Sequence, residues 1–385
     1  MAKIQTTQIR SAYDGSVLFE APGQFAEVFL TAIEKNIDLK GIDVSNQDLS
    51  NVDISEAALK RSTPLSFEGG IFNNANLTNS TIVNADLTNV SFIKAEAPGM
   101  NLLDCKMSDV NMSSIHAPGM RIKAKDITEC QFTEAKIQGA HFDVDFWRDV
   151  FFTADLQGAS FKPKSRMNNV DFGLSLLTNV NISQVQFEQS CLGTGTQTVE
   201  KLNARGAKFK NCNIGYTEYL KCDFSYCQFT ENTKISTTNF KKCNLNFVHM
   251  DGAQVTKLHL RESSCIAADI TAKWVNSSFT NSDISDTDFN YTDLTQNKFE
   301  NVSADGTKFG KSDLSQSVIQ NCKWESAIMR EALGTKVVLL DSKLPYNQLK
   351  VTQEPIVKLS PRLLVSDLPP GIEKVVRLGS REFSN

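Results

Sequence analysis

The 385-residue sequence lacks long apolar runs and a strong excess of either charge. No stretch approaches the roughly 18 consecutive apolar residues of a membrane-spanning helix, and the opening MAKIQTTQIRSAYDGSVLFEA has no apolar core of a secretory signal. The 40 basic and 44 acidic side chains leave a formal charge of −4, which argues against a surface that coats nucleic acid. We therefore expect a cytoplasmic protein with no membrane partner and no direct nucleic-acid partner.

Residues that commonly perform catalysis or bind metals are also few. The sequence has only four histidines and contains no CxxC, P-loop, GxGxxG or GxSxG motif. Seven of the nine cysteines occupy positions that otherwise hold small apolar residues, where cysteine acts as a small hydrophobic residue. These observations predict a protein that is not an enzyme and has no catalytic residue, cofactor or metal site.

The sequence does contain an apolar residue at every fifth position over long stretches. From Phe72 to Phe152, all 17 residues reached by steps of five are apolar. The residue two positions earlier is mostly small, as at Ala75 and Ala85. A helix repeats every 3.6 residues and a strand every two, so a period of five fits neither. The same step begins at Leu39 and recurs in blocks as far as Met329.

Stretches such as NNANLTNSTIVNADLTNVSF and FTNSDISDTDFNYTDL resemble the pentapeptide-repeat family, whose unit is approximately A(D/N)LXX. The resemblance covers roughly residues 37–329. It implies an all-β fold, a right-handed quadrilateral β-helix solenoid in which four pentapeptides make one coil. The central residue and the small residue two before it would point inward, and the other three would point outward.

The tetrapeptide APGM occurs at Ala97–Met100 and again at Ala117–Met120. Twenty residues make one coil in this fold, so the two copies should lie one above the other. Two stacked alanines would replace two large interior residues, and the prolines would follow them on the surface. We expect a thinned core with an outer bend on this face; the alternative is a groove where a partner docks.

Two segments outside the repeat differ in composition. Residues 1–36 are predicted to form a hairpin around Asp14-Gly15 and an amphipathic helix in 23–36, which together cap the first coil. This leader resembles the N-terminal segments of phage- and prophage-encoded pentapeptide proteins. Residues 330–385 hold five of the ten prolines and lose the five-residue step. Their short β-type runs (337–340, 356–359, 363–365 and 374–378) predict either a cap or an arm that adds strands to a neighbouring subunit.

Breaks in the pattern near 60–70, 162–170 and 193–206 are predicted to be loops that interrupt the repeat region, 37–329. Loops on rigid scaffolds often carry function, and these loops gather basic residues. The aromatic stretch FDVDFWRDVFF (142–152) is interpreted as a kinked, partly filled coil rather than a ligand site. The candidate partner-binding residues are Lys60, Arg61, Lys162, Lys164, Arg166, Lys201, Arg205, Pro98 and Pro118.

Two functions are consistent with these observations. The first is a non-enzymatic structural or interaction rod, a phage-encoded virion-associated protein that joins self or virion subunits through its caps and its C-terminal arm. It would lie in the host cytoplasm or in the virion. The alternative is a DNA mimic that binds DNA gyrase or topoisomerase, as some members of the family do. A DNA mimic needs continuous rows of outward-facing acidic side chains, but basic residues such as Lys106, Lys136 and Lys208 interrupt the acidic rows. The first function is therefore favoured.

Overall fold

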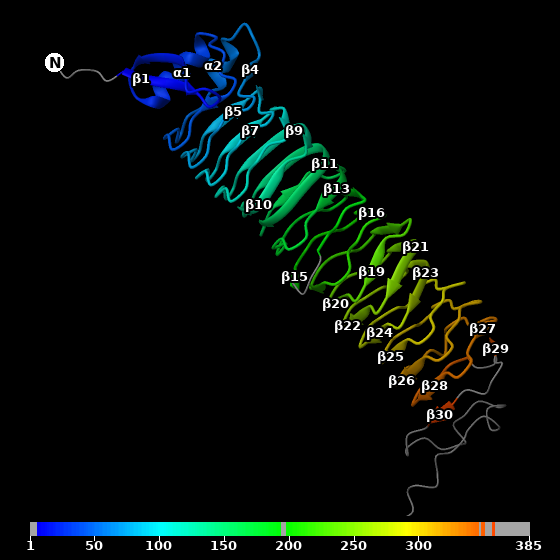
Figure 1. Ribbon diagram of the computed structural model, residues 1–385. Coiled ribbons are helices and arrows are strands. Elements are labelled where there is room, and N and C mark those ends of the chain that lie inside the picture. Colours follow the sequence, from blue (N-terminus) through cyan, green and yellow to red (C-terminus); the bar gives the residue numbers. More distant parts are fainter. Residues whose placement is uncertain (1–5, 194–197, 346–347, 351–355, 359–385) are drawn as a thin grey trace, which may run out of the picture. The chain divides into compact units, whose positions relative to one another are not determined.

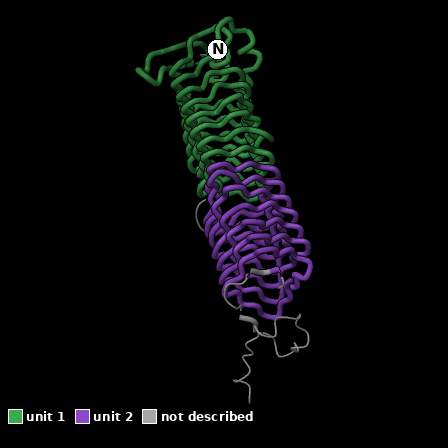
Figure 2. Tube along the Cα trace, turned by 90° about the vertical axis from the view of Figure 1, so that its right-hand side faces the viewer, with its two compact units in different colours: residues 1–193 green, residues 194–385 purple. Residues whose placement is uncertain are grey.

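The computed structural model of the chain describes residues 6–193, 198–345, 348–350 and 356–358. The chain separates into two compact units, residues 1–193 and residues 194–385 (Figure 2). Each unit is a solenoid of short parallel strands joined by tight turns (Figure 1). The predicted all-β fold with four pentapeptides per coil is confirmed, because residues paired on neighbouring coils, such as Ile82 and Leu102, are commonly 20 positions apart. Of the described residues, none belongs to a helix whose length and apolar character would suit a bilayer crossing.

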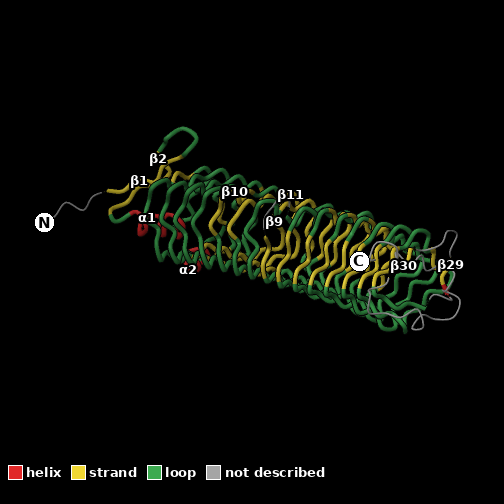
Figure 3. Tube along the Cα trace, turned by 90° about the horizontal axis from the view of Figure 1, so that it is seen from below, coloured by secondary structure: helices red, strands yellow, loops and turns green. Residues whose placement is uncertain are grey.

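A hairpin and a helix precede the coils of unit 1 (Figure 3). The hairpin strands are antiparallel, and the first of them also pairs with the start of the solenoid. The helix buries Val28, Phe29, Ala32 and Ile33, and the Phe29 ring stacks on Phe67 with centroids 5.7 Å apart. The helix therefore covers the apolar start of the solenoid. These elements are β1 (Thr6–Ser11), β2 (Val17–Pro22), α1 (Phe25–Glu34), β3 (Ile42–Asp43) and α2 (Ser55–Leu59).

Most of the remaining strands of unit 1 pair in parallel with strands of the preceding and following coils. Asn101 pairs with both Thr81 and Arg121, so one outward row of side chains runs through three coils. The strands are β4 (Leu65–Ser66), β5 (Thr81–Val83), β6 (Ala85–Asp86), β7 (Asn101–Leu103), β8 (Met107–Ser108), β9 (Arg121–Thr128), β10 (Gln131–Lys136), β11 (His141–Asp155), β12 (Ser160–Phe161), β13 (Arg166–Asp171) and β14 (Gln186–Glu188).

Unit 2 is built in the same way. Phe299 pairs with Phe279 on one side and with Ile319 on the other. The strands are β15 (Thr198–Glu200), β16 (Lys208–Lys210), β17 (Glu218–Leu220), β18 (Gln228–Thr230), β19 (Lys234–Ser236), β20 (Asn239–Lys241), β21 (His249–Thr256), β22 (His259–Arg261), β23 (Asp269–Val275), β24 (Ser278–Thr280), β25 (Lys298–Glu300), β26 (Val318–Gln320), β27 (Ala332–Leu333), β28 (Val338–Leu340), β29 (Leu349–Lys350) and β30 (Ile356–Lys358).

Many pentapeptides end in a tight turn at the corner of a coil. The N–H of Ala75 donates to the carbonyl of Phe72 at 3.2 Å, and Asn74 between them has φ = 55°. A positive φ at the third residue is the mark of a type II turn, which favours Gly or Asn there. The second residue after each central one is therefore a corner residue, and its left-handed backbone explains the frequent Asn, Asp and Gly at this position.

The outward Asp or Asn of each repeat also has a structural role. The Oδ1 atom of Asp48 accepts the N–H of Ser50 at 3.0 Å, and Asn76 accepts the N–H of Thr78 at 3.1 Å. The Ser50 backbone N–H, followed by its hydroxyl, lowers the pKa of Asp48 below its usual value. These side chains hold the backbone of the turn, which is the common reason for Asp and Asn in such places.

The core consists of columns of central side chains. Phe152 stacks on Phe132 at 4.7 Å and on Phe172 at 4.9 Å, which matches the spacing between neighbouring strands of about 4.7–4.9 Å. In unit 2, several small inward positions hold hydroxyl residues. Thr307 Oγ1 donates to the carbonyl of Ile284 at 2.8 Å, so the buried hydroxyl is satisfied by the preceding coil.

The interruptions are shorter than the sequence predicted. In the 60–70 break, Leu65 and Phe67 are already buried core residues. In 162–170, the interior spacing rises to six residues between Phe161 and Met167, after falling to four between Phe152 and Leu156. The 162–170 break is therefore one extra residue that restores the register.

The break at 193–206 is also mostly coil, because Val199 and Ala204 are buried and β15 pairs with β17. Residues 194–197 lie outside the described residues. Unit 2 contains its own pair of changes, with a spacing of six residues from Phe229 to Ile235 and of four from Ile270 to Trp274.

The sequence analysis predicted that the repeat ends at Met329, but the coils continue beyond this residue. Leu339 and Leu344 continue the five-residue step and are buried. Two later segments add further strands to unit 2 itself, since β29 pairs with β27 and β30 pairs with β28. The predicted β-type runs at 363–365 and 374–378 lie outside the described residues.

The two APGM copies do stack, because the N–H of Gly99 donates to the carbonyl of Pro118 at 2.9 Å. The expectation of a thinned core did not take two neighbouring methionines into account. Met100 and Met120 occupy inward positions that are usually small, and both are fully buried. We infer that the methionines supply the volume that the two alanines leave.

Candidate functional site

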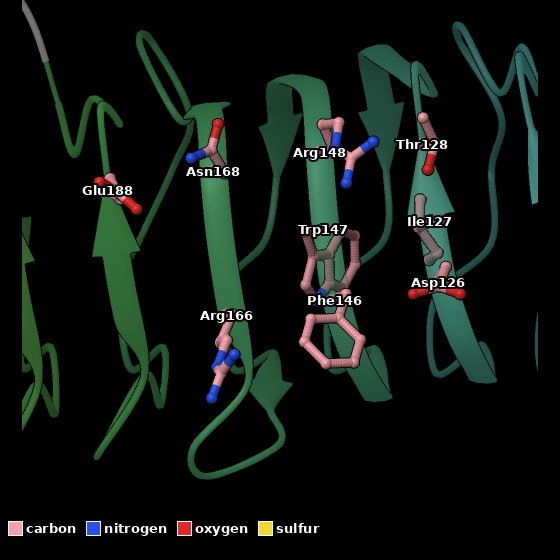
Figure 4. A pocket seen from close by; sticks show the side chains of 9 residues that line it. All are labelled: Asp126, Ile127, Thr128, Phe146, Trp147, Arg148, Arg166, Asn168 and Glu188. Carbon is pink, nitrogen blue, oxygen red and sulfur yellow. The ribbon is translucent and has the colours of Figure 1, made fainter.

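A groove of about 520 Å³ lies on the outer surface of unit 1, across β9, β11, β13 and β14 (Figure 4). We call it the β11 groove. It is lined by Asp126, Ile127, Thr128, Phe146, Trp147, Arg148, Arg166, Asn168 and Glu188.

The stacking of the coils places the outward-facing side chains in two parallel rows, with the buried Ile127 and Trp147 between them. Phe146 pairs with Asp126 on one neighbouring coil and with Arg166 on the other. Arg148 pairs with Thr128 and Asn168 in the same way, two positions along each strand. Figure 4 shows both rows. A fixed register thus brings residues about 20 positions apart into one surface.

Phe146 stands where the repeat usually has Asn or Asp, and its side chain is 40% exposed. The guanidinium carbon of Arg166 lies 5.6 Å from the centroid of the Phe146 ring. Cation–π contacts at exposed sites contribute about 0.5–1 kcal/mol. The contact therefore orients Arg166 across the groove while leaving part of the aromatic ring accessible.

The basic and acidic side chains of the groove lie on different coils. Arg148 and Arg166 lie near its middle, whereas Asp126 and Glu188 come from the coils on either side. Arg148 also acts on a nearby acidic corner: the pKa of Glu129 is raised, mainly because its carboxyl shares a hydrogen bond with Asp109, and Arg148 partly opposes that shift. The groove can pair with charged groups of either sign beside an aromatic surface.

Residues 71–113 and 277–316 match the family model for pentapeptide repeats, in eight copies. This match coincides with the five-residue coil seen in both units. The chain is a pentapeptide-repeat protein.

Several solved structures resemble parts of this pentapeptide-repeat protein. The plasmid-mediated fluoroquinolone resistance protein QnrB1 is 19% identical, with 48% of this chain and 91% of QnrB1 covered and a TM-score of 0.28. HetL, involved in heterocyst differentiation regulation in the cyanobacterium Nostoc sp. strain PCC 7120, is 15% identical over 61% of this chain and 90% of HetL, with a TM-score of 0.21.

The bacteriophage CBA120 tailspike protein 3 is 9% identical over 86% of this chain and 55% of the tailspike, with a TM-score of 0.21. None of these TM-scores reaches 0.5, so the three likenesses give no information on function. No curated protein matches the sequence.

Of the candidate residues predicted in the repeat protein, only Arg166 lines the β11 groove. Lys162 contacts Asp143 and Asp145 at 2.7 and 2.9 Å, and the hydrogen bonds to these two carboxylates raise the pKa of Lys162 to about 12. Lys164 is a corner residue with φ = 67°. The predicted 162–170 segment thus contributes one residue to the groove.

The other candidates in unit 1 form contacts within the chain. Arg61 Nη1 donates to the carbonyls of Ile33 and Ile37, at 3.0 and 3.2 Å. The carbonyls of Pro98 and Pro118 accept corner N–H groups of the preceding coil. Lys60 contacts Glu34 at 2.8 Å.

Two candidates lie in unit 2. Lys201 is a corner residue 3.9 Å from Glu200, and Arg205 stacks on Tyr226.

Sequence analysis missed most of the groove. It interpreted 142–152 as a kinked, partly filled coil. The strand β11 does turn a corner within this stretch, at Asp149 with φ = 53°, but its interior is filled. The aromatic residues Phe142, Trp147 and Phe152 are buried and pack on one another with ring centroids 5.4–6.2 Å apart. The usable signal was the outward aromatic Phe146 at a position that otherwise favours Asn or Asp.

Proposed function

We propose that this pentapeptide-repeat protein is a non-enzymatic scaffold that binds other proteins, and that the β11 groove is its binding site in unit 1. The observation that carries the proposal is the partly exposed Phe146 ring beside Arg166, with Arg148 two positions further along the same strand. The occupant that fits best is a protein segment with an aromatic or aliphatic side chain next to a carboxylate. The apolar group would cover Phe146, and the carboxylate would pair with a guanidinium.

The setting supports a binding role because the groove is pre-formed. Its rows belong to hydrogen-bonded strands, and Trp147 beneath them is buried. A partner therefore orders few groups of this chain when it binds, which keeps the entropic cost low. Aromatic and arginine residues are also the types most enriched at the centres of protein interfaces.

Photo-crosslinking in the producing cells tests this proposal. Benzoylphenylalanine at position 146 should give discrete covalent adducts with a partner. The same residue at position 151 is the matched control, because Phe151 is also on β11, is 48% exposed and lies outside the groove. Arg166→Gln should reduce the adduct at 146, and Lys164→Gln should not. Equal adducts at 146 and 151, or none at 146, would contradict the proposal.

The identity of the partner as a virion subunit stays a prediction from the resemblance of residues 1–36 to phage-encoded proteins, as does attachment through the C-terminal arm. Purified phage particles from the producing strain should contain the chain if it is a virion component. Deleting residues 359–385 should then remove it from the particles. If the chain is absent from the particles, the virion assignment is wrong, while the scaffold proposal is still decided by the crosslinks.

A further inference from the structure

We propose that unit 2 carries a separate protein-binding site, a slot at one corner of its coils that receives an arginine side chain of a partner protein. The slot lies between Phe247 and Asp286, above the small residue Ala267. It is independent of the β11 groove, and it goes beyond the proposed function by naming the group that is recognised.

The residues of the slot stand on successive coils at one corner. The N–H of Phe247 donates to the carbonyl of Ile266 at 2.9 Å, and the N–H of Ala267 donates to that of Ser285 at 3.0 Å. Coils stack at about 4.8 Å. Phe247 and Asp286 are therefore two coil spacings apart, which is about 10 Å. Because Ala267 between them has a small side chain, this distance leaves room for one planar group.

An aromatic ladder forms one wall of the slot. The rings of Tyr226 and Phe247 are stacked with centroids 4.8 Å apart and an interplanar angle of 14°. On the far side of the ladder, the guanidinium carbon of Arg205 lies 4.4 Å from the Tyr226 centroid. Arg205 covers one end of the ladder, so the free face of Phe247 is the end that remains for a partner.

The two aromatic residues are unusual for their positions. Both are corner residues with φ = 60°, where Asn or Gly fits with less strain. Their side chains are nevertheless 46% and 48% exposed, so burial in unit 2 does not compensate for the strained backbone. Strained and exposed aromatic residues are typical of binding surfaces rather than of folding determinants.

The charge at the slot selects a cation. Asp283, Asp286 and Asp305 lie on the coils that follow Ala267, and none of them forms an ion pair within 4.0 Å with another described residue. Asp286 leans toward Gly306, and its carboxylate has no side-chain hydrogen bond among the described residues that would hold it there. It is free to turn toward a cation over Ala267. Phosphate groups would be repelled by the same carboxylates.

Arginine fits the slot better than lysine. A guanidinium is planar, stacks on an aromatic face and can bind a carboxylate through two parallel hydrogen bonds, whereas an ammonium is a compact point charge. Arg205 on Tyr226 shows the same stacking inside the chain. A shallow groove of about 660 Å³ on the same side of the coils, lined in part by Asn244, Ser264 and Asp283, has room for the backbone that carries the arginine.

Saturation-transfer difference NMR with the full-length protein tests the slot. The probe is the peptide Gly-Arg-Gly, blocked at both ends, and Gly-Lys-Gly is the comparison. We expect transfer to the arginine side-chain protons with a Kd in the millimolar range and weaker transfer to lysine. Phe247→Asn, which suits the corner backbone, should weaken binding about three- to fivefold. Asp286→Asn should weaken it by a similar factor.

Tyr216→Asn is the matched control, because Tyr216 is another exposed corner aromatic, with φ = 56° and 57% exposure, on a different corner. It should leave binding unchanged. Equal transfer to both peptides, or equal loss in Phe247→Asn and Tyr216→Asn, would overturn the slot. Because neither variant touches unit 1, crosslinks at Phe146 report on the β11 groove separately.

Discussion

At the scale of single residues, position within the pentapeptide determines what a side chain does. Phe289 is fully buried and stacks on Phe309 with centroids 5.5 Å apart. Its neighbour Asp288 faces outward, where it accepts the N–H of Asn290 at 2.9 Å and lies 3.5 Å from Lys308. Adjacent residues therefore differ sharply in how much they contribute to stability.

Replacing these two neighbours should give opposite outcomes. Phe289→Asp places an unpaired carboxylate in the core and leaves a cavity, so it should reduce the free energy of unfolding by about 4 kcal/mol or more. Asp288→Ser loses one exposed ion pair and part of a turn hydrogen bond, and should cost about 1 kcal/mol or less. Urea unfolding followed by circular dichroism measures both. Similar losses would show that the inward and outward positions are assigned wrongly.

At the scale of elements, the N-terminal helix depends on a residue from the loop that follows α2. The carbonyls of Ile33, in the last turn of α1, and of Ile37, just after the helix, accept hydrogen bonds from Arg61. A cation at a helix C-terminus also interacts favourably with the helix dipole. Arg61 therefore fastens the cap to the solenoid, whereas Lys60 forms an ion pair whose two side chains are about half exposed.

Arg61→Ala should loosen the cap selectively. Losing two hydrogen bonds from a charged donor should cost about 1.5–3 kcal/mol locally, and Lys60→Ala should cost less than about 1 kcal/mol. Hydrogen exchange of the α1 amides is the measurement, since it reports local opening. Faster exchange throughout unit 1, or the same rates in both variants, would be inconsistent with a local fastening role.

At the scale of the whole molecule, the acidic rows do not form a continuous negative surface. Asp86 lies 3.1 Å from Lys106 on the next coil, and Asp288 lies 3.5 Å from Lys308. Exposed pairs of this kind contribute little stability, but each one neutralises a carboxylate that a DNA mimic would need to display. The outward Asp residues also serve the turns, which explains their frequency without mimicry.

We therefore expect no inhibition of DNA gyrase supercoiling by the purified protein at amounts stoichiometric with the enzyme. A DNA-mimic control protein in the same assay establishes its sensitivity. Clear inhibition that disappears in the triple variant Asp283→Asn, Asp288→Asn, Asp293→Asn would favour mimicry over the scaffold function. Inhibition that persists in this variant would place the gyrase contact elsewhere on the chain.

The five-residue step predicted the interior well because a buried column tolerates only apolar or small side chains. It failed where a central residue is small. Gly334 occupies a central position between Met329 and Leu339, so the apolar step is interrupted in the sequence although the coil continues. The β11 groove was harder to predict, because outward positions accept many residue types. Phe146 stands out only once the repeat's preference for Asn or Asp there is understood.

The paired spacing changes have a consequence for how such a chain can vary in length. In each unit, a six-residue step and a four-residue step cancel, as at Phe161–Met167 and Phe152–Leu156. The two changes compensate each other, so the five-residue register is shifted only in the residues between them. An uncompensated insertion would put outward residues into the interior until the frame is restored. Whole blocks of about 20 residues keep the frame, and each such block would act as a spacer one strand distance, about 4.8 Å, in height.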